Sequence, residues 1–122
     1  MNDITRLVER YLATWNLADT AERRAEIAAI WTEDARYVDP LVDAAGPDAI
    51  DATIEAARRQ FPGLVFTLAG DVDAHHDLAR FTWHLGPEGG EPIVVGFDVA
   101  VLAGDRRIRT VHGFLDRVPA AR

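Results

Sequence analysis

Apolar side chains in the first half of the chain recur every three or four residues, a pattern typical of helices with one buried face. This spacing predicts a first helix near residues 3–16. A second helix begins in the stretch Asp19–Glu22, which has the form of a capping box. A third starts at Gly46–Pro47 and ends before Pro62–Gly63. The buried stripe of the second helix is expected to carry Ile27, Ile30 and Trp31.

From residue 64 the apolar period becomes two, which predicts strands over residues 64–71, 78–85, 93–103 and 107–117. A short extended segment is also expected over residues 36–40, because the proline at its end disfavours helical backbone in the residue before it. Helices followed by strands indicate an α+β fold, a cone-like curved antiparallel sheet with three N-terminal helices packed on its concave face. The length of 122 residues predicts one domain, residues 1–122.

Composition narrows the possible chemistry. The sequence contains no Cys, Ser or Lys, which excludes disulfides, thiolate and serine nucleophiles and Schiff-base lysines. Proton transfer by Asp, Glu, His or Tyr remains. The net charge of −7 disfavours nucleic acid and anionic membranes as partners. With no signal-like or membrane-spanning stretch, the chain is expected to be cytoplasmic, and its high Ala and Arg content suggests a bacterial origin.

Two aspartates are the candidate acid and base. Asp98 lies in the apolar run 93–102, where burial would raise the pKa of its carboxyl and make it a neutral hydrogen-bond donor. Asp39, before a proline, would be the ionised partner that takes a proton. Two alternatives stay open: Asp39 is an ordinary turn residue, or Asp98 forms a structural ion pair with Arg80 or Arg36.

The histidines offer weaker signals. Residues 71–77 combine aspartates with two adjacent histidines, but they lie at a connection between strands, so we expect hydrated side chains and no metal site. His84 alternates with the apolar residues of its strand and is expected to face away from them, whereas the direction of His112 stays open. We expect no cofactor.

The order of these elements and the Tyr-Val-Asp-Pro sequence at Asp39 resemble the nuclear transport factor 2-like superfamily. The closer resemblance is to its SnoaL-like branch, which includes ketosteroid isomerase and polyketide cyclases. The resemblance implies that Asp39 is the catalytic base and that Asp98 is a protonated oxyanion-binding acid. Trp15 stands where the isomerases have an oxyanion-binding tyrosine, so an indole N–H would replace a phenol.

The leading hypothesis is therefore a cofactor-independent isomerase or cyclase with Asp39, Asp98 and Trp15 as catalytic residues. Its substrate would be a small apolar or carbonyl-containing ligand held in an apolar pocket, and the alternative is a non-catalytic module that binds a hydrophobic metabolite. An epoxide hydrolase of the limonene type ranks last, because the segment 80–82 lacks the Asp of the required Arg-x-Asp. We expect a homodimer formed through the sheet. The residues expected to bind the ligand are Trp31, Tyr37, Phe61 and Trp83.

Overall fold

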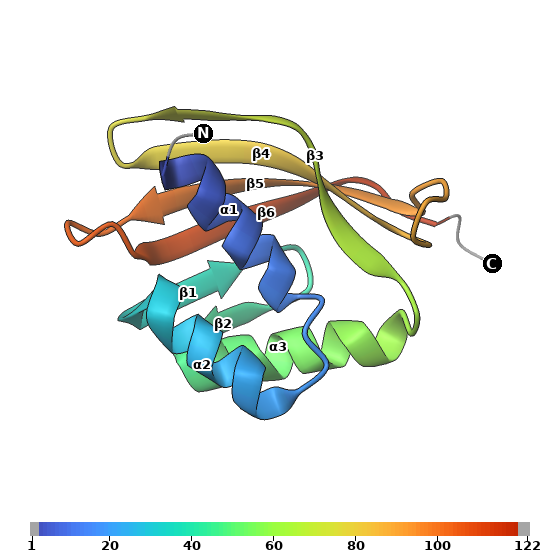
Figure 1. Cartoon of the computed structure of the whole chain (residues 1–122), viewed down its shortest axis with the longest axis horizontal. Helices are drawn as coiled ribbons and strands as arrows, with labels where there is room; N and C mark the ends of the chain where they lie inside the picture. The colour runs from blue at the N-terminus through green and yellow to red at the C-terminus, as the bar shows by residue number, and fades with distance from the viewer. Residues whose placement is uncertain (1–2, 120–122) are drawn as a thin grey trace.

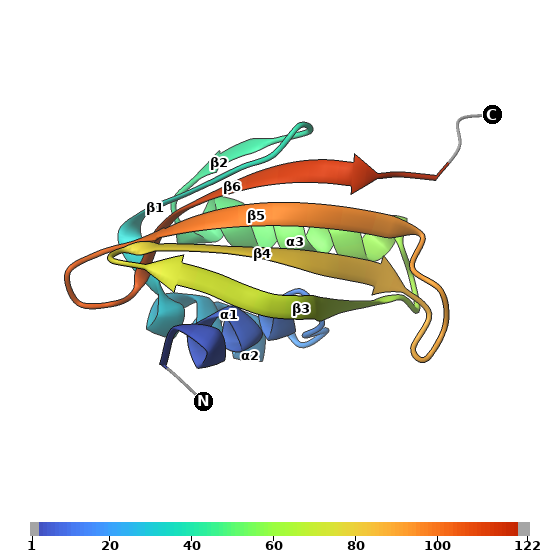
Figure 2. The ribbon, with the colours of Figure 1, turned by 90° about the horizontal axis from the view of Figure 1, so that it is seen from above.

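The computed structural model describes residues 3–119, which form three helices and a six-stranded sheet (Figure 1). The helices are α1 (Asp3–Thr14), α2 (Thr20–Ile30) and α3 (Pro47–Gln60). The strands are β1 (Trp31–Val38), β2 (Asp43–Ala45), β3 (Val65–His75), β4 (Leu78–Gly86), β5 (Val94–Leu102) and β6 (Ile108–Arg117). The described helices all lie on one face of the curved sheet, and Figure 2 shows the uncovered face. This is the α+β fold expected from the sequence.

The strands form one sheet in the order β2-β1-β6-β5-β4-β3. Strand β1 runs parallel to β6, and all the other neighbours are antiparallel. The sheet is therefore mixed rather than wholly antiparallel. The parallel pair forms because α2 delivers β1 to the edge of β6, the last strand along the chain. Such a pair joins distant segments and needs no tight turn that a sequence could reveal.

The second helix ends one residue earlier than its apolar stripe suggests. Trp31, expected on the helix, is the first residue of β1 and pairs with Ile108 of β6. Its backbone N–H still closes the helix by donating to the Ile27 carbonyl oxygen. The extended segment expected over residues 36–40 is thus the end of a longer strand. The partner strand β2 was not predicted from the sequence, because its three residues have no period of their own.

The connection expected over residues 71–77 is mostly strand. Strand β3 continues to His75, and its register against β4 shifts between Ala69 and Asp73. Gly70 at this irregularity has a φ of 78°, a backbone angle that glycine adopts without strain. The turn itself is short and contains His76, which has a φ of 53°.

Several local signals in the sequence are confirmed. Asp19 caps α2 by accepting a hydrogen bond from the Glu22 backbone nitrogen at 2.9 Å, and Pro47 begins α3. His84 lies on the face of β4 opposite the buried side chains, as expected. His112 also lies on the face away from the helices, where its ring approaches the hydroxyl of Thr110 at 3.3 Å.

Two polar contacts fix the helices that border the cavity described below. The buried guanidinium of Arg23 on α2 bonds Asp51 at 2.6 Å and Glu55 at 2.8 Å, both on α3. Removing one partner of such a pair typically costs about 3–5 kcal/mol, because the other charge stays buried. Asn16, after α1, bonds both the backbone nitrogen and the carbonyl oxygen of Phe66 on β3, at 2.8 and 2.9 Å. Within residues 3–119, no helix is both long and apolar enough to cross a membrane.

Candidate active site

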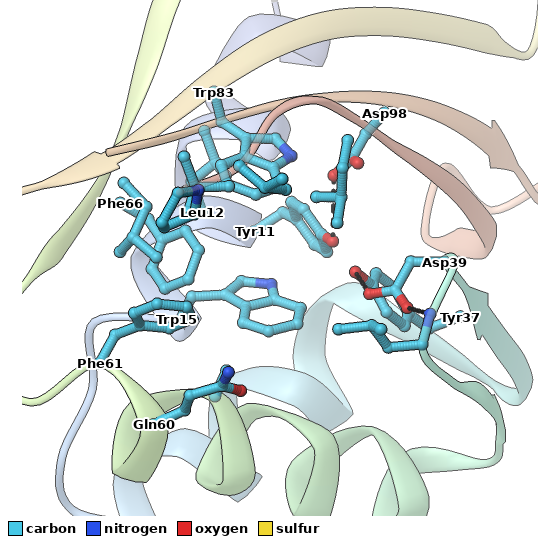
Figure 3. Close-up of a pocket in the computed structure, with 17 residues that line it drawn as sticks. Tyr11, Leu12, Trp15, Tyr37, Asp39, Gln60, Phe61, Phe66, Trp83 and Asp98 are labelled. Atoms are coloured by element: carbon cyan, nitrogen blue, oxygen red, sulfur yellow. Dashed lines mark hydrogen bonds between the residues drawn. The ribbon is translucent and has the colours of Figure 1, made fainter. Parts of the chain in front are cut away.

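A cavity of about 270 Å³ lies between the helix-covered face of the sheet and helices α1 and α3 (Figure 3). Several aromatic rings lie along its wall, each next to another. The centroid of Trp15 lies 5.4 Å from that of Tyr37 and 5.3 Å from that of Phe66, and Phe66 lies 5.4 Å from Trp83. Asp39 and Asp98 both line this same cavity.

Asp98 faces the cavity because of the alternation of side chains along β5. Its side chain is 2% exposed. The Tyr11 hydroxyl donates to Asp98 Oδ2 at 3.3 Å, while Oδ1 has no hydrogen-bond partner among the described residues. A buried carboxyl oxygen without a partner is costly unless a ligand or a proton satisfies it. This oxygen is therefore the polar atom most in need of a partner in the cavity.

Gly96 allows Trp83 to approach this carboxyl. A Cβ atom at residue 96 would lie 2.0 Å from Cζ2 of the Trp83 ring, so the indole packs directly on the glycine backbone. In Figure 3 the indole nitrogen of Trp83 points toward Asp98. Glycine at this position of β5 is thus required by the packing of the neighbouring strand.

Burial raises the pKa of Asp98 from 3.8 to about 7. The Trp83 indole and the Tyr11 hydroxyl oppose this shift because they favour the charged carboxylate, whereas the negative charge of Asp39 adds to it. Asp98 is consequently neutral in a substantial fraction of molecules near pH 7. Burial also raises the pKa of Tyr11 well above its ordinary value, followed in size by the effect of the Asp98 charge, so Tyr11 remains a donor.

Asp39 is held in a different environment, in the turn between β1 and β2. Its Oδ1 accepts hydrogen bonds from the backbone nitrogens of Leu41 at 2.8 Å and Val42 at 3.0 Å, and its Oδ2 accepts one from the Tyr37 hydroxyl at 2.7 Å. A carboxylate accepts at about four lone-pair positions and donates at none, so this set of donors suits the ionised form. One acceptor position, on Oδ2, is left for a proton from a ligand.

The two carboxyl groups lie on either side of Gly113 of β6. A Cβ atom there would be 3.0 Å from Asp98 Oδ1 and 3.3 Å from Asp39 Cβ. Asp98 Oδ1 and Asp39 Cβ are therefore no further apart than the sum of these two distances. A side chain at residue 113 would therefore crowd both acids, and glycine leaves this position free.

Tyr11 is the site residue that the sequence reasoning missed. It lies on α1, one helical turn before Trp15, so both side chains are on the same face of the helix. Trp15 lines the cavity at the position expected for an oxyanion donor, but the hydroxyl that bonds Asp98 belongs to Tyr11. The helical repeat was the signal available, because a phenol four residues from Trp15 had to share its face.

The structure places three of the four expected ligand-binding residues around the cavity. Tyr37, Phe61 and Trp83 line it, and Tyr37 also holds Asp39. Trp31 does not line it: its side chain is 1% exposed and packs edge-on against the other side of Tyr11, with ring centroids 5.9 Å apart. Its distance from the cavity follows from its position at the start of β1 rather than on α2.

The alternative partners suggested for Asp98 are bound elsewhere. Arg80 pairs with Asp73 at 2.9 Å, and Arg36 pairs with Asp43 at 2.6 Å, both on the surface. A structural ion pair between Asp98 and either arginine is thus excluded. Within residues 3–119, no group of three or more His, Cys, Asp or Glu side chains is arranged to hold a metal ion.

Helices packed against one face of this curved sheet, with an acid on β5 facing an aromatic cavity, define the architecture of a nuclear transport factor 2-like protein. The sequence comparison makes the assignment specific. Residues 8–110 match the SnoaL-like domain family, and the chain belongs to that family. Among curated protein sequences, no match was found.

Solved structures give the same assignment. A proposed isomerase of the SnoaL-like family from Agrobacterium tumefaciens is 44% identical, with a TM-score of 0.86 over 91% of this chain and 95% of its own. A proposed polyketide cyclase from Sinorhizobium meliloti is 18% identical, with a TM-score of 0.68 over 88% of this chain and 93% of its own. A proposed SnoaL-like polyketide cyclase from Jannaschia sp. is 19% identical, with a TM-score of 0.69 over 95% of this chain and 90% of its own. At 18% and 19% identity, the two polyketide cyclase structures show that the fold is shared and no more than that.

Proposed function

We propose that the protein is a cofactor-independent enzyme of the isomerase or cyclase type that moves a proton at a carbon atom next to a carbonyl group. The observation that carries the proposal is the pair of carboxyl groups on one apolar cavity, one buried and one held by three hydrogen-bond donors. Two acids in such unequal environments can divide the roles of donor and acceptor at one pH. The similarity to a proposed isomerase of the same family supports this.

In the proposed reaction, Asp39 Oδ2 removes a proton from the carbon next to the carbonyl. The electron pair of the broken C–H bond forms the carbon–carbon double bond of an enolate, and the negative charge moves to the carbonyl oxygen. Protonated Asp98 donates a hydrogen bond to that oxygen. The Tyr11 hydroxyl, which donates to Asp98 Oδ2, holds the acid in position. The proton then returns from Asp39 to another carbon, which gives an isomer. Alternatively, the enolate carbon attacks a second carbonyl carbon, whose oxygen takes the electron pair of its C=O bond and then the proton from Asp39, which gives a ring.

The apolar surroundings help this chemistry in two ways. They exclude water from the enolate, which strengthens each hydrogen bond to it. They also keep Asp98 protonated at a pH where an exposed aspartate would have lost its proton. Trp15 contributes a face of the cavity near Tyr37.

Turnover of a panel of β,γ-unsaturated ketones and polyketide-like esters tests the proposal. We expect Asp39→Asn to lower kcat/KM by about 10²–10⁴-fold, the usual contribution of a general base. Asp98→Ala should lower it by about 10²–10³-fold, as expected for the loss of one oxyanion donor. The matched control is Asp43→Asn, which changes the same kind of side chain on the exposed surface and should leave kcat/KM unchanged.

The outcomes separate the proposed enzyme from its alternative. Full turnover in the Asp39 or Asp98 variant removes that residue from the mechanism. A wild-type protein that binds members of the panel without turning over any of them is the binding module, in which Asp98 only anchors the ligand.

A further inference from the structure

We infer that the cavity selects an uncharged carbonyl compound of one or two fused rings, carbonyl end inward, and rejects carboxylic acids. This inference concerns the substrate of the proposed function and rests on it. It draws on three features of the cavity that the proposed reaction leaves open: its charge, its volume and the character of its mouth.

The charge of the wall excludes anions. The ionisable side chains that line the cavity are two aspartates and two tyrosines, and within residues 3–119 no arginine or histidine lines it. The sequence contains no lysine. An anionic ligand would lie beside the Asp39 carboxylate in an apolar space with no cation to compensate it, a costly arrangement.

The volume limits the ligand. Cavities for drug-sized molecules usually enclose about 300–1,000 Å³, and this one encloses about 270 Å³. One ring or two fused rings fit such a space, whereas the third and fourth rings of a tetracyclic compound would extend beyond the mouth.

The mouth fixes the direction of the ligand. Leu41 and Val118 line the cavity although their side chains are 79% and 54% exposed, and Phe61 and Leu115 lie beside them in the wall. Asp98, with its unpartnered Oδ1, is buried at the inner side. The carbonyl oxygen of the ligand therefore points inward, and its hydrocarbon part lies against the apolar mouth.

The protonation state of Asp98 determines whether its carboxyl group binds the carbonyl of a ketone or the ammonium group of an amine. A protonated carboxyl donates to a carbonyl oxygen, whereas a carboxylate accepts from an ammonium group. The groups that face Asp98 are Tyr11 from α1, Trp83 from β4, and Tyr37 and Asp39 from β1 and the turn after it. None of them is cationic, so above about pH 7 an amine would gain affinity and a ketone would lose it.

Binding of three bicyclic probes of matched size tests the inference: 2-tetralone, 2-aminotetralin and tetrahydro-2-naphthoate. Titration calorimetry at pH 6 and pH 8 measures their affinity for the full chain. We expect the ketone to bind at least about tenfold more tightly than the acid. Its affinity should fall by about tenfold from pH 6 to pH 8, because protonated Asp98 becomes about tenfold rarer. A four-ring steroid ketone should bind more weakly than 2-tetralone.

Two variants test the role of charge. Asp39→Asn removes one negative charge but keeps an oxygen for the backbone donors of Leu41 and Val42, and it should raise the affinity for the acid toward that for the ketone. Asp43→Asn, an exposed site outside the cavity, should leave all affinities unchanged.

Three results would overturn the inference: the acid binds as tightly as the ketone, the affinity for the ketone does not fall from pH 6 to pH 8, or no probe binds. Because affinity is measured without turnover, the inference and the proposed function fail separately. Selective ketone binding without proton transfer refutes only the catalysis, and turnover of free acids refutes only the selectivity.

Discussion

Replacing Asp98 by asparagine should stabilise the fold, and the gain should grow with pH. In the unfolded chain this carboxyl ionises near its ordinary pKa of 3.8, whereas in the folded protein burial holds the pKa at about 7. Between these values the folded state binds one proton more than the unfolded state. The wild-type protein therefore loses stability as the pH rises through this interval, and the loss is complete above pH 7.

The magnitude follows from the size of the pKa shift. Each pKa unit corresponds to about 1.4 kcal/mol, so a rise from 3.8 to about 7 costs the wild type about 4 kcal/mol at pH 8 relative to pH 4. Asparagine is uncharged at every pH and avoids this loss. With a urea m-value of roughly 2 kcal/mol/M, the transition midpoints of variant and wild type should move apart by about 2 M over the same range.

Urea unfolding of the wild type and of Asp98→Asn at pH 4, 6 and 8 is the assay. The difference between the two proteins cancels the titration of the other carboxyl groups. Asp43→Asn is the control, because hydrogen bonding to Arg36 lowers the pKa of Asp43 and its effect should not vary from pH 6 to pH 8. If the stabilities of wild type and Asp98→Asn run parallel with pH, Asp98 does not carry the raised pKa and the reasoning fails.

Two further predictions concern packing and association. Gly96→Ala should lower the free energy of unfolding by about 3 kcal/mol, because the new Cβ would lie 2.0 Å from the Trp83 ring. The control Gly104→Ala, where a Cβ would have no atom within 4 Å, should change it by less than about 0.5 kcal/mol. Equal effects of the two substitutions in urea unfolding would contradict this packing. Phe114 is 56% exposed and alternates along β6 with the residues that face the helices. If a second copy binds there, Phe114→Asp should convert a dimer into a monomer in sedimentation velocity, and a monomeric wild type would refute the dimer.

Elements with a strong local signal were predictable from the sequence. The cap at Asp19, the proline at the start of α3 and the two-residue period of β4 and β5 act over a few residues, and each gave the right element within a few positions. The α+β class followed from their order. In these segments the local preference and the tertiary packing agree.

Elements that depend on distant contacts could not be predicted. Trp31 fits the helical stripe of Ile27 and Ile30, but pairing with Ile108 of β6 draws it into a strand. The three residues of β2 form a strand only because β1 is beside them. Such pairings are set by tertiary structure and not by propensity.

The same distinction applies to the site. The acids at 39 and 98 were identified from local context, a proline after one and an apolar run around the other. Their approach to each other depends on Gly113 of β6, and the hydroxyl that bonds Asp98 belongs to Tyr11, which was not predicted as a site residue. Whether Tyr11 reaches the acid depends on how α1 is placed on the sheet, which the sequence does not determine.

Exchange of ligand hydrogens with solvent tests the central claim most directly. A ketone that binds the cavity is incubated with the protein in D₂O, and NMR follows deuterium entering the carbon next to the carbonyl. We predict rapid exchange with the wild type and a rate at least about 100-fold lower with Asp39→Asn, with the ketone still bound. Equal exchange rates in the two proteins would contradict the claim that Asp39 removes the proton.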